Sequence, residues 1–198
     1  MDAFVAILAG GRSTRMGRPK PGLQLGGRSL IDYPIEAARA VGLEPWVIAK
    51  PETELPPLDC RLIEEPAEPV HPLCGVVAAL EAAAPWPVVV LAADMPFVED
   101  KLIAWLASQL GTTVVETGDR LEPLLGRYDS ADVDPLRESL ARDDAAQEAV
   151  RALNPKLVAE VDLRRFGDPA VLCFNVNTED DLREAERILA SRAPAGGQ

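Results

Sequence analysis

Residues 88–94 read VVVLAAD, an apolar run that ends in an acidic residue. A short, continuous apolar run is typical of a strand that is buried on both faces of a parallel sheet. Asp94 would then lie at the carboxyl end of a central strand, which is the edge where open α/β sheets bind their ligands. This stretch therefore predicts an α/β fold and also the place of its site.

Outward from this stretch, short apolar segments typical of strands alternate with longer segments of helical periodicity. The alternation predicts a largely parallel sheet covered by helices. Strands are expected at residues 3–8, 45–49, 61–63, 88–92, 113–116, 123–128, 157–161 and 171–174. Helices are expected at residues 30–41, 75–83, 99–109, 131–141, 145–153 and 179–191.

The length and composition suit one globular domain. The chain has 198 residues, of which 47% are hydrophobic, so we expect a single domain over residues 1–192 and a flexible tail over 193–198. The first residues contain neither a basic leader nor a long apolar run, which predicts a cytoplasmic protein without a membrane span. The three cysteines are widely spaced, which predicts neither a disulfide framework nor a zinc site.

The charge is unevenly distributed along the chain. The formal net charge of -12 disfavours nucleic acid as a partner, because a phosphate backbone selects basic surfaces. Residues 1–31 nevertheless hold only one acidic residue, Asp2, and five cations, namely Arg12, Arg15, Arg18, Lys20 and Arg28. Positive charge is therefore concentrated at one end of the chain.

Most of these cations lie in the stretch ILAGGRSTRMGRPKPGL, Ile7–Leu23, directly after the first expected strand. The stretch matches neither the P-loop nor the dinucleotide-binding fingerprint. Gly10 and Gly11 allow close backbone approach, and Arg15 and Lys20 can donate charge-assisted hydrogen bonds to an anion. A solvated basic turn is the alternative. A phosphate-binding loop is favoured because the loop and Asp94 are expected at the same sheet edge.

The stretch LAGGRSTRMGRPK, residues 8–20, resembles the N-terminal signature of the MobA family of nucleotidyltransferases. The stretches HPLCG (71–75), LAADMPFV (91–98), EPLLGRYD (122–129) and FNVNTEDDL (174–182) resemble later blocks of that family, in the family's order. The resemblance implies a Rossmann-like three-layer α/β/α sandwich with a mostly parallel central sheet. It also implies transfer of GMP from GTP to the terminal phosphate of the molybdenum–molybdopterin cofactor, with release of pyrophosphate.

The resemblance also implies roles for individual residues. Catalysis would fall to Arg15, Lys20 and Asp94, and Asp94 would hold Mg²⁺. Capping of the following helix is the alternative role for Asp94. The implied nucleotide-binding residues are Leu8, Ala9, Gly10, Gly11, Arg12, Ser13, Lys20, Glu65, Leu73, Gly75 and Asp94.

Three of these implied assignments depend on local context. Glu64 is an equal candidate for the acidic position given to Glu65. Leu73 and Gly75 are expected to form a close backbone turn against the nucleotide, and the nearby His71 is expected to be incidental to catalysis. Residues 47–50 fall where the family recognises guanine, but they lack the asparagine that is common there.

The acceptor side of the site is implied by two further blocks. Asn175 and Asn177 lie at the end of an expected strand, ahead of a helix that Thr178 can cap through its hydroxyl. Neither asparagine is needed for capping, and the resemblance assigns this block to the acceptor side. Glu122 begins another candidate acceptor-side segment. The alternative for Glu122 is a surface position on a strand.

Two other classes of function compete with guanylyl transfer. The first is a related nucleotidyltransferase that uses CTP, or a sugar or corrinoid phosphate as the acceptor. The second is a non-catalytic nucleotide-binding adaptor, which is disfavoured because Arg15, Lys20 and Asp94 occur together. The expected ligands are GTP, Mg²⁺ and a molybdopterin-type cofactor, and the expected protein partners are transient contacts with molybdoenzyme-delivery proteins.

Overall fold

The computed structural model describes residues 3–10 and 20–192. Its centre is a seven-stranded sheet with the order β5–β4–β1–β6–β8–β7–β9. Strand β8 runs antiparallel to both of its neighbours, and the other pairings are parallel. The strands are β1 (Phe4–Leu8), β4 (Glu44–Ala49), β5 (Arg61–Glu64), β6 (Val88–Ala92), β7 (Thr113–Thr117), β8 (Arg120–Tyr128) and β9 (Lys156–Ala159).

Helices connect most of these strands. Two are single 3-10 turns, η1 (Lys20–Gly22) and η2 (Ser130–Asp132). The α-helices are α1 (Asp32–Ala40), α2 (Pro72–Ala83), α3 (Asp100–Ala107), α4 (Val133–Ala141), α5 (Ala146–Ala152), α6 (Glu160–Leu163), α7 (Pro169–Leu172) and α8 (Glu179–Arg192). Within the described ranges, no helix combines the length and the apolar composition needed to cross a membrane.

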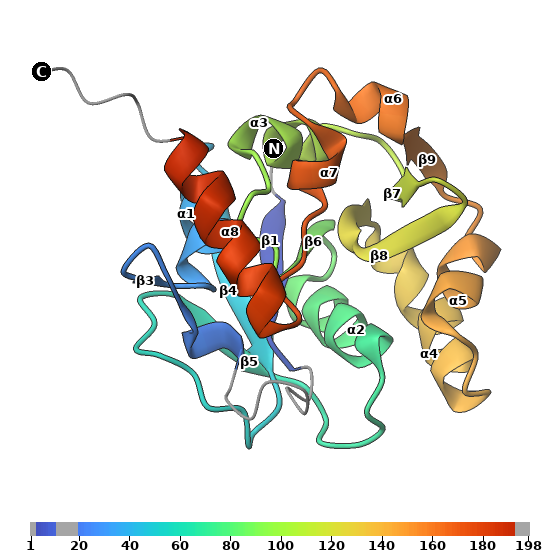
Figure 1. Ribbon diagram of the computed structural model, residues 1–198. Helices are drawn as coiled ribbons and strands as arrows, with labels where there is room; N and C mark the ends of the chain where they lie inside the picture. Colours follow the sequence, from blue (N-terminus) through green and yellow to red (C-terminus); the bar gives the residue numbers. More distant parts are fainter. Residues whose placement is uncertain (1–2, 11–19, 193–198) are drawn as a thin grey trace, which may run out of the picture.

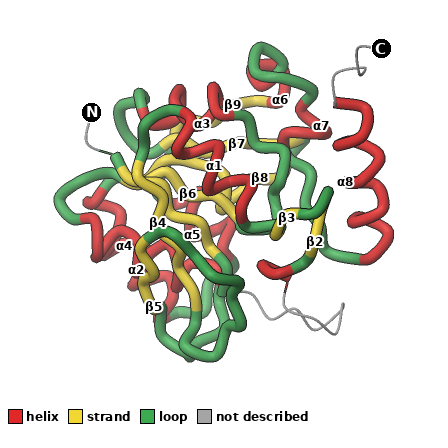
Figure 2. Tube along the Cα trace, turned by 90° about the vertical axis from the view of Figure 1, so that its left-hand side faces the viewer, coloured by secondary structure: helices red, strands yellow, loops and turns green. Residues whose placement is uncertain are grey.

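The sheet is covered on both faces, as the continuous apolar strands require. Side chains alternate between faces along a strand, so Val89 and Leu91 of β6 pack with α1 and α3, whereas Val88 and Val90 pack with α2, α4 and α5. Figures 1 and 2 show the sheet between these two groups of helices. The predicted three-layer α/β/α sandwich is confirmed.

The order in which strands are added to the sheet changes sides between β1 and β6. From β1 the chain adds β4 and then β5 on one side, and it returns through α2 to place β6 on the other side of β1. Crevices at such a switch point are where doubly wound sheets bind ligands. Gly10 and Asp94 follow β1 and β6, so they both lie at this crevice.

Three local features differ from the predictions. The expected strand at 171–174 is the end of helix α7, which Asp168 caps by accepting a hydrogen bond from the Ala170 amide at 3.0 Å. A two-stranded hairpin, β2 (Gln24–Leu25) and β3 (Arg28–Ser29), was not anticipated. The expected strand at 157–161 is shorter, because helix α6 begins at Glu160.

The β2–β3 hairpin packs beside α8, outside the main sheet (Figures 1 and 2). Leu25, Leu30, Phe97, Val176 and Ala185 form a small separate core there. This core joins the segment after η1, the segment after β6 and the segment before α8. The three segments that approach the predicted site are therefore held against one another by apolar contacts.

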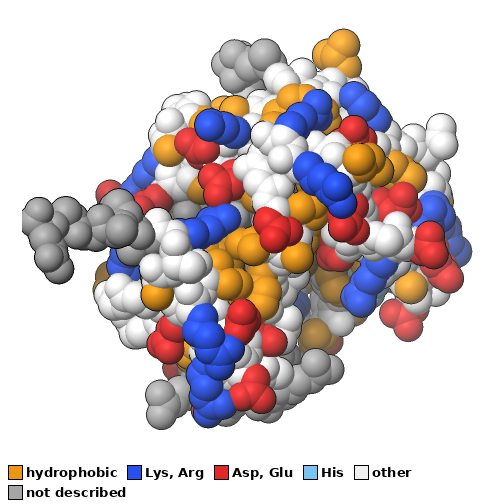
Figure 3. Space-filling view, turned by 45° about the horizontal axis from the view of Figure 1, so that its top comes forward, with side chains coloured by type: hydrophobic (Ala, Val, Ile, Leu, Met, Phe, Trp, Pro, Cys, Tyr) orange, Lys and Arg blue, Asp and Glu red, His pale blue; other side chains and the backbone are white. Residues whose placement is uncertain are grey.

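The described surface mixes charges of both signs. On the face drawn in Figure 3, acidic and basic side chains are interspersed, and hydrophobic side chains gather in a hollow near the middle. Several of the charges form ion pairs, such as Arg142 with Asp144 at 2.8 Å and Arg192 with Glu99 at 3.2 Å. Cys60, Cys74 and Cys173 are free thiols.

Candidate functional site

A cavity of about 220 Å³ opens at the carboxyl edge of the sheet, and we call it the first cavity. The ends of β1, β4 and β6 contribute to it, together with the segments that follow β5 and precede α2. Five of the predicted nucleotide-binding residues line it, namely Leu8, Ala9, Gly10, Glu65 and Asp94. Residues far apart in the sequence are thus brought to one edge, as the sequence predicts.

Glu65 lies between two glycines that leave room for it. A Cβ atom on Gly10 would lie 1.7 Å from Glu65 Oε1, and a Cβ atom on Gly75 would lie 3.0 Å from Glu65 Oε2. Any side chain at position 10 would therefore displace the carboxyl group. The structure also separates the two acidic candidates, because Glu65 is buried and lines the first cavity, whereas Glu64 is exposed and does not.

Lys50 is a buried cation that fixes the segment after Glu65. Its Nζ donates hydrogen bonds to the carbonyl oxygens of Pro66 at 2.6 Å and Ala67 at 2.9 Å, and it lies 4.0 Å from Glu65 Oε1. Burial raises the pKa of the Glu65 carboxyl, and the nearby Lys50 ammonium lowers it in part. The sequence pattern singled out residues 47–50 only for a missing asparagine, although a buried lysine directly after a buried strand is itself unusual.

The predicted backbone turn at Leu73 and Gly75 is wrong, because both residues belong to the first turns of α2. Leu73 is fully buried in the core, and Gly75 lets the helix approach Leu8, whose Cδ2 would lie 2.9 Å from an added Cβ. His71 caps this helix. Its Nδ1 accepts a hydrogen bond from the Leu73 amide at 3.2 Å, and its Nε2 lies 3.1 Å from the Asp144 carbonyl oxygen. The histidine therefore has a structural role at the cavity wall.

Asp94 lines both the first cavity and a neighbouring one of about 260 Å³, which we call the second cavity. Its capping alternative is not found, because Glu99 occupies the N-cap position of α3. The backbone carbonyl of Asp94 accepts a hydrogen bond from the Val176 amide at 2.9 Å. This bond ties the turn after β6 to the segment that precedes α8.

The chemistry of Asp94 suits a magnesium ion that arrives with a phosphate ligand. Among the described residues, no group of three or more His, Cys, Asp or Glu side chains could hold a metal ion by itself. Mg²⁺ keeps several water molecules and is commonly bound through one or two carboxylates together with substrate phosphates. A single carboxylate at a cavity edge fits that mode of binding, and it does not fit a closed protein cage.

A bulge in β8 forms the wall between the two cavities. Along β7, Val114 pairs with Gly126, whereas the next residue, Val115, pairs with Glu122. Leu124, within the extra residues, lines both cavities. The fully buried Tyr128 holds the bulge by donating a hydrogen bond from its hydroxyl to the Pro123 carbonyl oxygen at 2.7 Å. Bulges of this kind redirect side chains beside functional sites.

The second cavity contains two of the three predicted acceptor residues. Glu122 and Asn175 line it, and Asn177 lines neither cavity. The Glu122 carboxylate accepts a hydrogen bond from Thr117 Oγ1 at 2.9 Å. The side-chain amide of Asn175 donates a hydrogen bond to the backbone oxygen of Cys173 at 2.9 Å. The side-chain amide of Asn177 lies 3.5 Å from the backbone oxygen of Asn175. The expectation that the two asparagines lie at the end of a strand is not met, because they follow helix α7.

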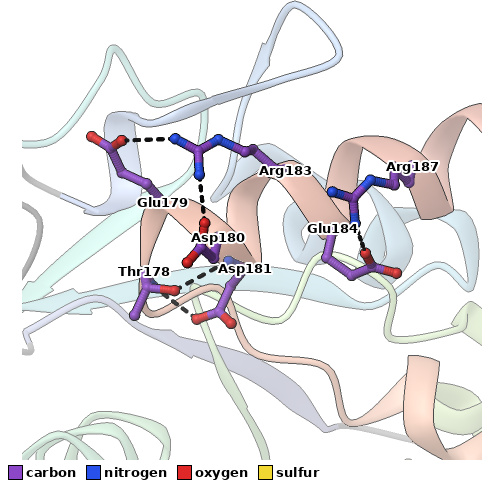
Figure 4. Close-up of polar contacts among 7 residues, drawn as sticks. All are labelled: Thr178, Glu179, Asp180, Asp181, Arg183, Glu184 and Arg187. Carbon is purple, nitrogen blue, oxygen red and sulfur yellow. Dashed lines mark hydrogen bonds and ion pairs between the residues drawn. The ribbon is translucent and has the colours of Figure 1, made fainter.

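The predicted cap of α8 is confirmed. Thr178 Oγ1 accepts a hydrogen bond from the Asp181 amide at 3.1 Å, and the Asp181 carboxylate accepts one from the Thr178 amide at 2.8 Å (Figure 4). The same carboxylate also accepts a hydrogen bond from the backbone amide of Asn177 at 2.9 Å. This reciprocal pair fixes where the helix begins. It also fixes the backbone that carries the two asparagines.

The predicted phosphate loop is described only at its ends. Gly11, Arg12, Ser13 and Arg15 lie outside the described residues. Gly10 lines the first cavity, and so does Pro21, the neighbour of Lys20 in η1. Both ends of the loop therefore reach the same cavity.

Comparisons with known proteins agree with this geometry. The family model of the MobA-like NTP transferase domain matches residues 5–160. A probable molybdenum cofactor guanylyltransferase of Pelotomaculum thermopropionicum is 32% identical, over 99% of this chain and 97% of that protein. A molybdenum cofactor guanylyltransferase of Rhizobium johnstonii is 32% identical, over 92% of this chain and 91% of that protein.

Solved structures show the same fold. The crystal structure of molybdopterin-guanine dinucleotide biosynthesis protein A from Archaeoglobus fulgidus superposes with a TM-score of 0.81 at 26% identity, over 94% of this chain and 98% of that one. A 2-C-methyl-D-erythritol 4-phosphate cytidylyltransferase from Thermus thermophilus superposes with a TM-score of 0.68 at 24% identity, over 96% of this chain and 100% of that one. The second likeness concerns the fold alone.

Proposed function

Because this chain belongs to the MobA-like NTP transferase family, we propose that it is a molybdenum cofactor guanylyltransferase. It transfers GMP from GTP to the terminal phosphate of the molybdenum–molybdopterin cofactor, and pyrophosphate is released. One observation carries this proposal. Asp94 is the acidic residue that lines both cavities, so a nucleotide in one and a phosphate acceptor in the other would meet at the same carboxylate.

The reaction joins two anions, and this decides what the protein must supply. An oxygen of the acceptor phosphate forms a bond to the α-phosphorus of GTP, and the bond from that phosphorus to the β-phosphate oxygen breaks, with pyrophosphate as the leaving group. Holding the two reactants in line and neutralising their charge supplies most of the acceleration in such reactions. The first cavity takes the nucleotide in this proposal, and the second takes the acceptor.

Each part of the first cavity has a role in the proposal. The amides of the loop from Gly10 to Ser13 and the cations Arg12, Arg15 and Lys20 bind the triphosphate, with Arg15 and Lys20 placed at the reacting phosphates. Asp94 would hold Mg²⁺, which supplies positive charge at the phosphate oxygens. Support comes from Gly10 and Pro21, which bring both ends of the loop to this cavity.

Glu65 binds the nucleoside end of GTP in this proposal. Its carboxyl is held at the cavity between two glycines, so its position is fixed before the nucleotide arrives. On the acceptor side, Glu122 and Asn175 contact the cofactor directly. Asn177 acts beside them through its contact with the Asn175 carbonyl oxygen.

The test is pyrophosphate release by the purified protein with each of the four NTPs and a panel of acceptors. The panel contains molybdenum–molybdopterin, a sugar phosphate and a corrinoid phosphate. We expect release with GTP and molybdenum–molybdopterin together, and only with Mg²⁺ present. Equal release with CTP would contradict guanylyl transfer, and no release with any pair would favour the non-catalytic adaptor.

The setting of the reaction is a further part of the proposal. We place the protein in the cytoplasm, in transient contact with proteins that deliver the finished cofactor to molybdoenzymes. The support for the contact is the resemblance of this chain to the MobA family. Cell fractionation and crosslinking in cells test the location and the contact separately.

A further inference from the structure

The second cavity contains a cation that no residue role above uses. Arg120 begins β8 and is the only cation among the described residues that line this cavity. Asp94 and Glu122 are its acidic lining residues. A cavity with two carboxylates and an anionic ligand needs a compensating positive charge, and Arg120 is placed to supply it.

The guanidinium group of Arg120 is available for a ligand. It makes no hydrogen bond or ion pair with any described residue, although the chain is strongly acidic. The other arginine of β8, Arg127, is engaged at the opposite end of the strand, since it donates to the Gly111 carbonyl oxygen at 2.6 Å and pairs with Asp129 at 2.8 Å. The adjacent Asp119 forms no ion pair with it among the described residues, and Glu122, two residues further along, is already held by Thr117.

The position of Arg120 separates it from the reacting group. Leu125 of β8 pairs with Leu91 of β6, and from there β8 continues past the carboxyl end of β6 toward Arg120. Arg120 pairs with Thr117 at the tip of the β7–β8 hairpin. The chemistry takes place at Asp94, beside the end of β6, so Arg120 is set at the outer end of the acceptor cavity.

We propose that Arg120 binds the anionic, metal-bearing end of the acceptor and so determines which phosphates are accepted. This inference rests on the proposed function and adds a specificity residue to it. The planar fork of a guanidinium group suits paired anionic oxygen or sulfur atoms, which a simple alkyl phosphate does not present at that distance from its phosphate. Arg120 selects the acceptor in this view, and it leaves the reacting phosphate to other residues.

The test compares Arg120→Ala, Arg120→Lys and the unaltered protein by two measurements. One is acceptor-dependent pyrophosphate release, and the other is calorimetric titration with GTP or with molybdenum–molybdopterin alone. For Arg120→Ala we expect the acceptor KM and Kd to rise roughly ten- to a hundred-fold, since a hydrogen bond to a charged group is lost. We expect kcat and the Kd for GTP to stay within about twofold, since neither depends on this contact. Arg120→Lys should recover part of the loss, because it keeps the charge without the fork.

Arg164→Ala is the matched control, because Arg164 is exposed, lies outside both cavities and also follows a segment end. It should leave every constant unchanged. An unaltered acceptor Kd in Arg120→Ala, a fall in kcat alone, or a loss of GTP binding would each overturn the inference. If the unaltered protein released no pyrophosphate, the proposed function would fail, whereas the titration with the acceptor would still decide the role of Arg120.

Discussion

The two cavities that share Asp94 are bounded by different kinds of structure. Ends of the parallel strands β1, β4 and β6 line the first, and its acidic residue Glu65 is buried beside a buried cation. A bulged antiparallel strand, a short helix and an irregular segment line most of the second, and its cation is exposed.

This difference indicates a division of labour. The first cavity is shaped by close backbone packing and a buried pair, so under the proposed function it would leave little freedom for a different nucleotide. The second is shaped by side chains on a hairpin tip and a loop, which are the parts that vary most readily among proteins of one fold. Nucleotide choice should therefore depend on packing, and acceptor choice on individual exposed side chains.

Asp94→Asn is the substitution that should affect both cavities at once. It keeps the size of the side chain and removes the charge that would hold Mg²⁺, so turnover should fall by about 10³-fold or more, since a bound metal supplies several kcal/mol of charge stabilisation. Steady-state kinetics over a range of Mg²⁺ concentrations measures the effect, and a urea unfolding curve checks that the fold is kept. Turnover like that of the unaltered protein would remove Asp94 from the mechanism.

Lys50→Met tests whether the first cavity depends on its buried pair. The change leaves the Glu65 carboxylate buried without a cation, so the free energy of unfolding should fall by about 3–5 kcal/mol. Urea unfolding of Lys50→Met and of the double variant Lys50→Met/Glu65→Gln measures it, and the double variant should recover part of the loss. Arg137→Met, which breaks the exposed pair with Glu81, serves as control and should change the free energy little.

The same pair gives a pH dependence of known sign. The pKa of Glu65 is raised in the folded protein, so the folded state holds this proton at a pH where the unfolded chain has lost it. The contribution of Glu65 to stability is therefore greatest below its unfolded pKa and is lost as the pH rises through the folded pKa. Without Lys50 the pKa should rise further. The loss in free energy of unfolding caused by Lys50→Met should accordingly be larger at mildly alkaline pH than at acidic pH. An equal loss at both pH values would contradict the pairing.

Asn175→Ala tests the second cavity alone. Losing a hydrogen bond to a charged acceptor should weaken acceptor use by about 1.5–3 kcal/mol, roughly ten- to a hundred-fold, with GTP binding nearly unchanged. Asn177→Ala should have a smaller effect in the same direction, because Asn177 lines neither cavity and, in the proposed function, acts through its contact with Asn175. Calorimetry with GTP and acceptor-dependent kinetics separate the two sides. A variant that lost GTP binding and kept its acceptor constants would place Asn175 on the nucleotide side.

Gly10→Ala tests the close packing of the first cavity. The added Cβ would lie 1.7 Å from Glu65 Oε1, so the carboxyl must move. The expected cost is about 1–3 kcal/mol of stability, together with weaker GTP binding. Gly22→Ala is the control, since an added Cβ there meets nothing within 4 Å. Thermal unfolding and GTP titration measure both variants, and equal behaviour of the two would show that the packing at Gly10 is not needed.

Tyr128→Phe should give the smallest effect. It removes the hydrogen bond to the Pro123 carbonyl oxygen, which should cost about 1 kcal/mol. Because that bond holds the bulge with Glu122 and Leu124, the acceptor KM should rise more than the Kd for GTP. Tyr33→Phe is the control, since its hydroxyl bonds to the Leu25 carbonyl oxygen away from both cavities. A similar response of both variants would argue against a positioning role for Tyr128.

The strands at the centre of the sheet were predictable because their chemistry is local. Val88–Ala92 is apolar throughout, and its burial on both faces follows from that. The segment 171–174 is also apolar, but only four residues long, so its periodicity does not distinguish a strand from a helix. The Asp168–Pro169 pair before it is a helix-start signal, and the Gly26–Gly27 pair is a hairpin signal. Both signals were available in the sequence.

Site residues within a local sequence motif were predictable, whereas contacts between residues far apart in the sequence were not. The place of Asp94 follows from the strand before it. The contact of Lys50 with the carbonyl oxygens after Glu65 does not, because it depends on how the segment after β5 folds back. The wall between the cavities likewise depends on a bulge that the sequence of β8 does not reveal.

The return of the chain from β5 to β6 has a consequence for how this protein folds. Strands β1 and β6 are neighbours in space, yet η1, the strands β2 to β5 and the helices α1 and α2 lie between them in the sequence. Closing such a long loop costs entropy that only later contacts offset, and pairings of this kind slow folding. The crevice between Gly10 and Asp94 therefore does not exist in any fragment that ends before β6. A ligand that binds it should stabilise the sheet as one cooperative unit, so nucleotide affinity can report on completion of the fold.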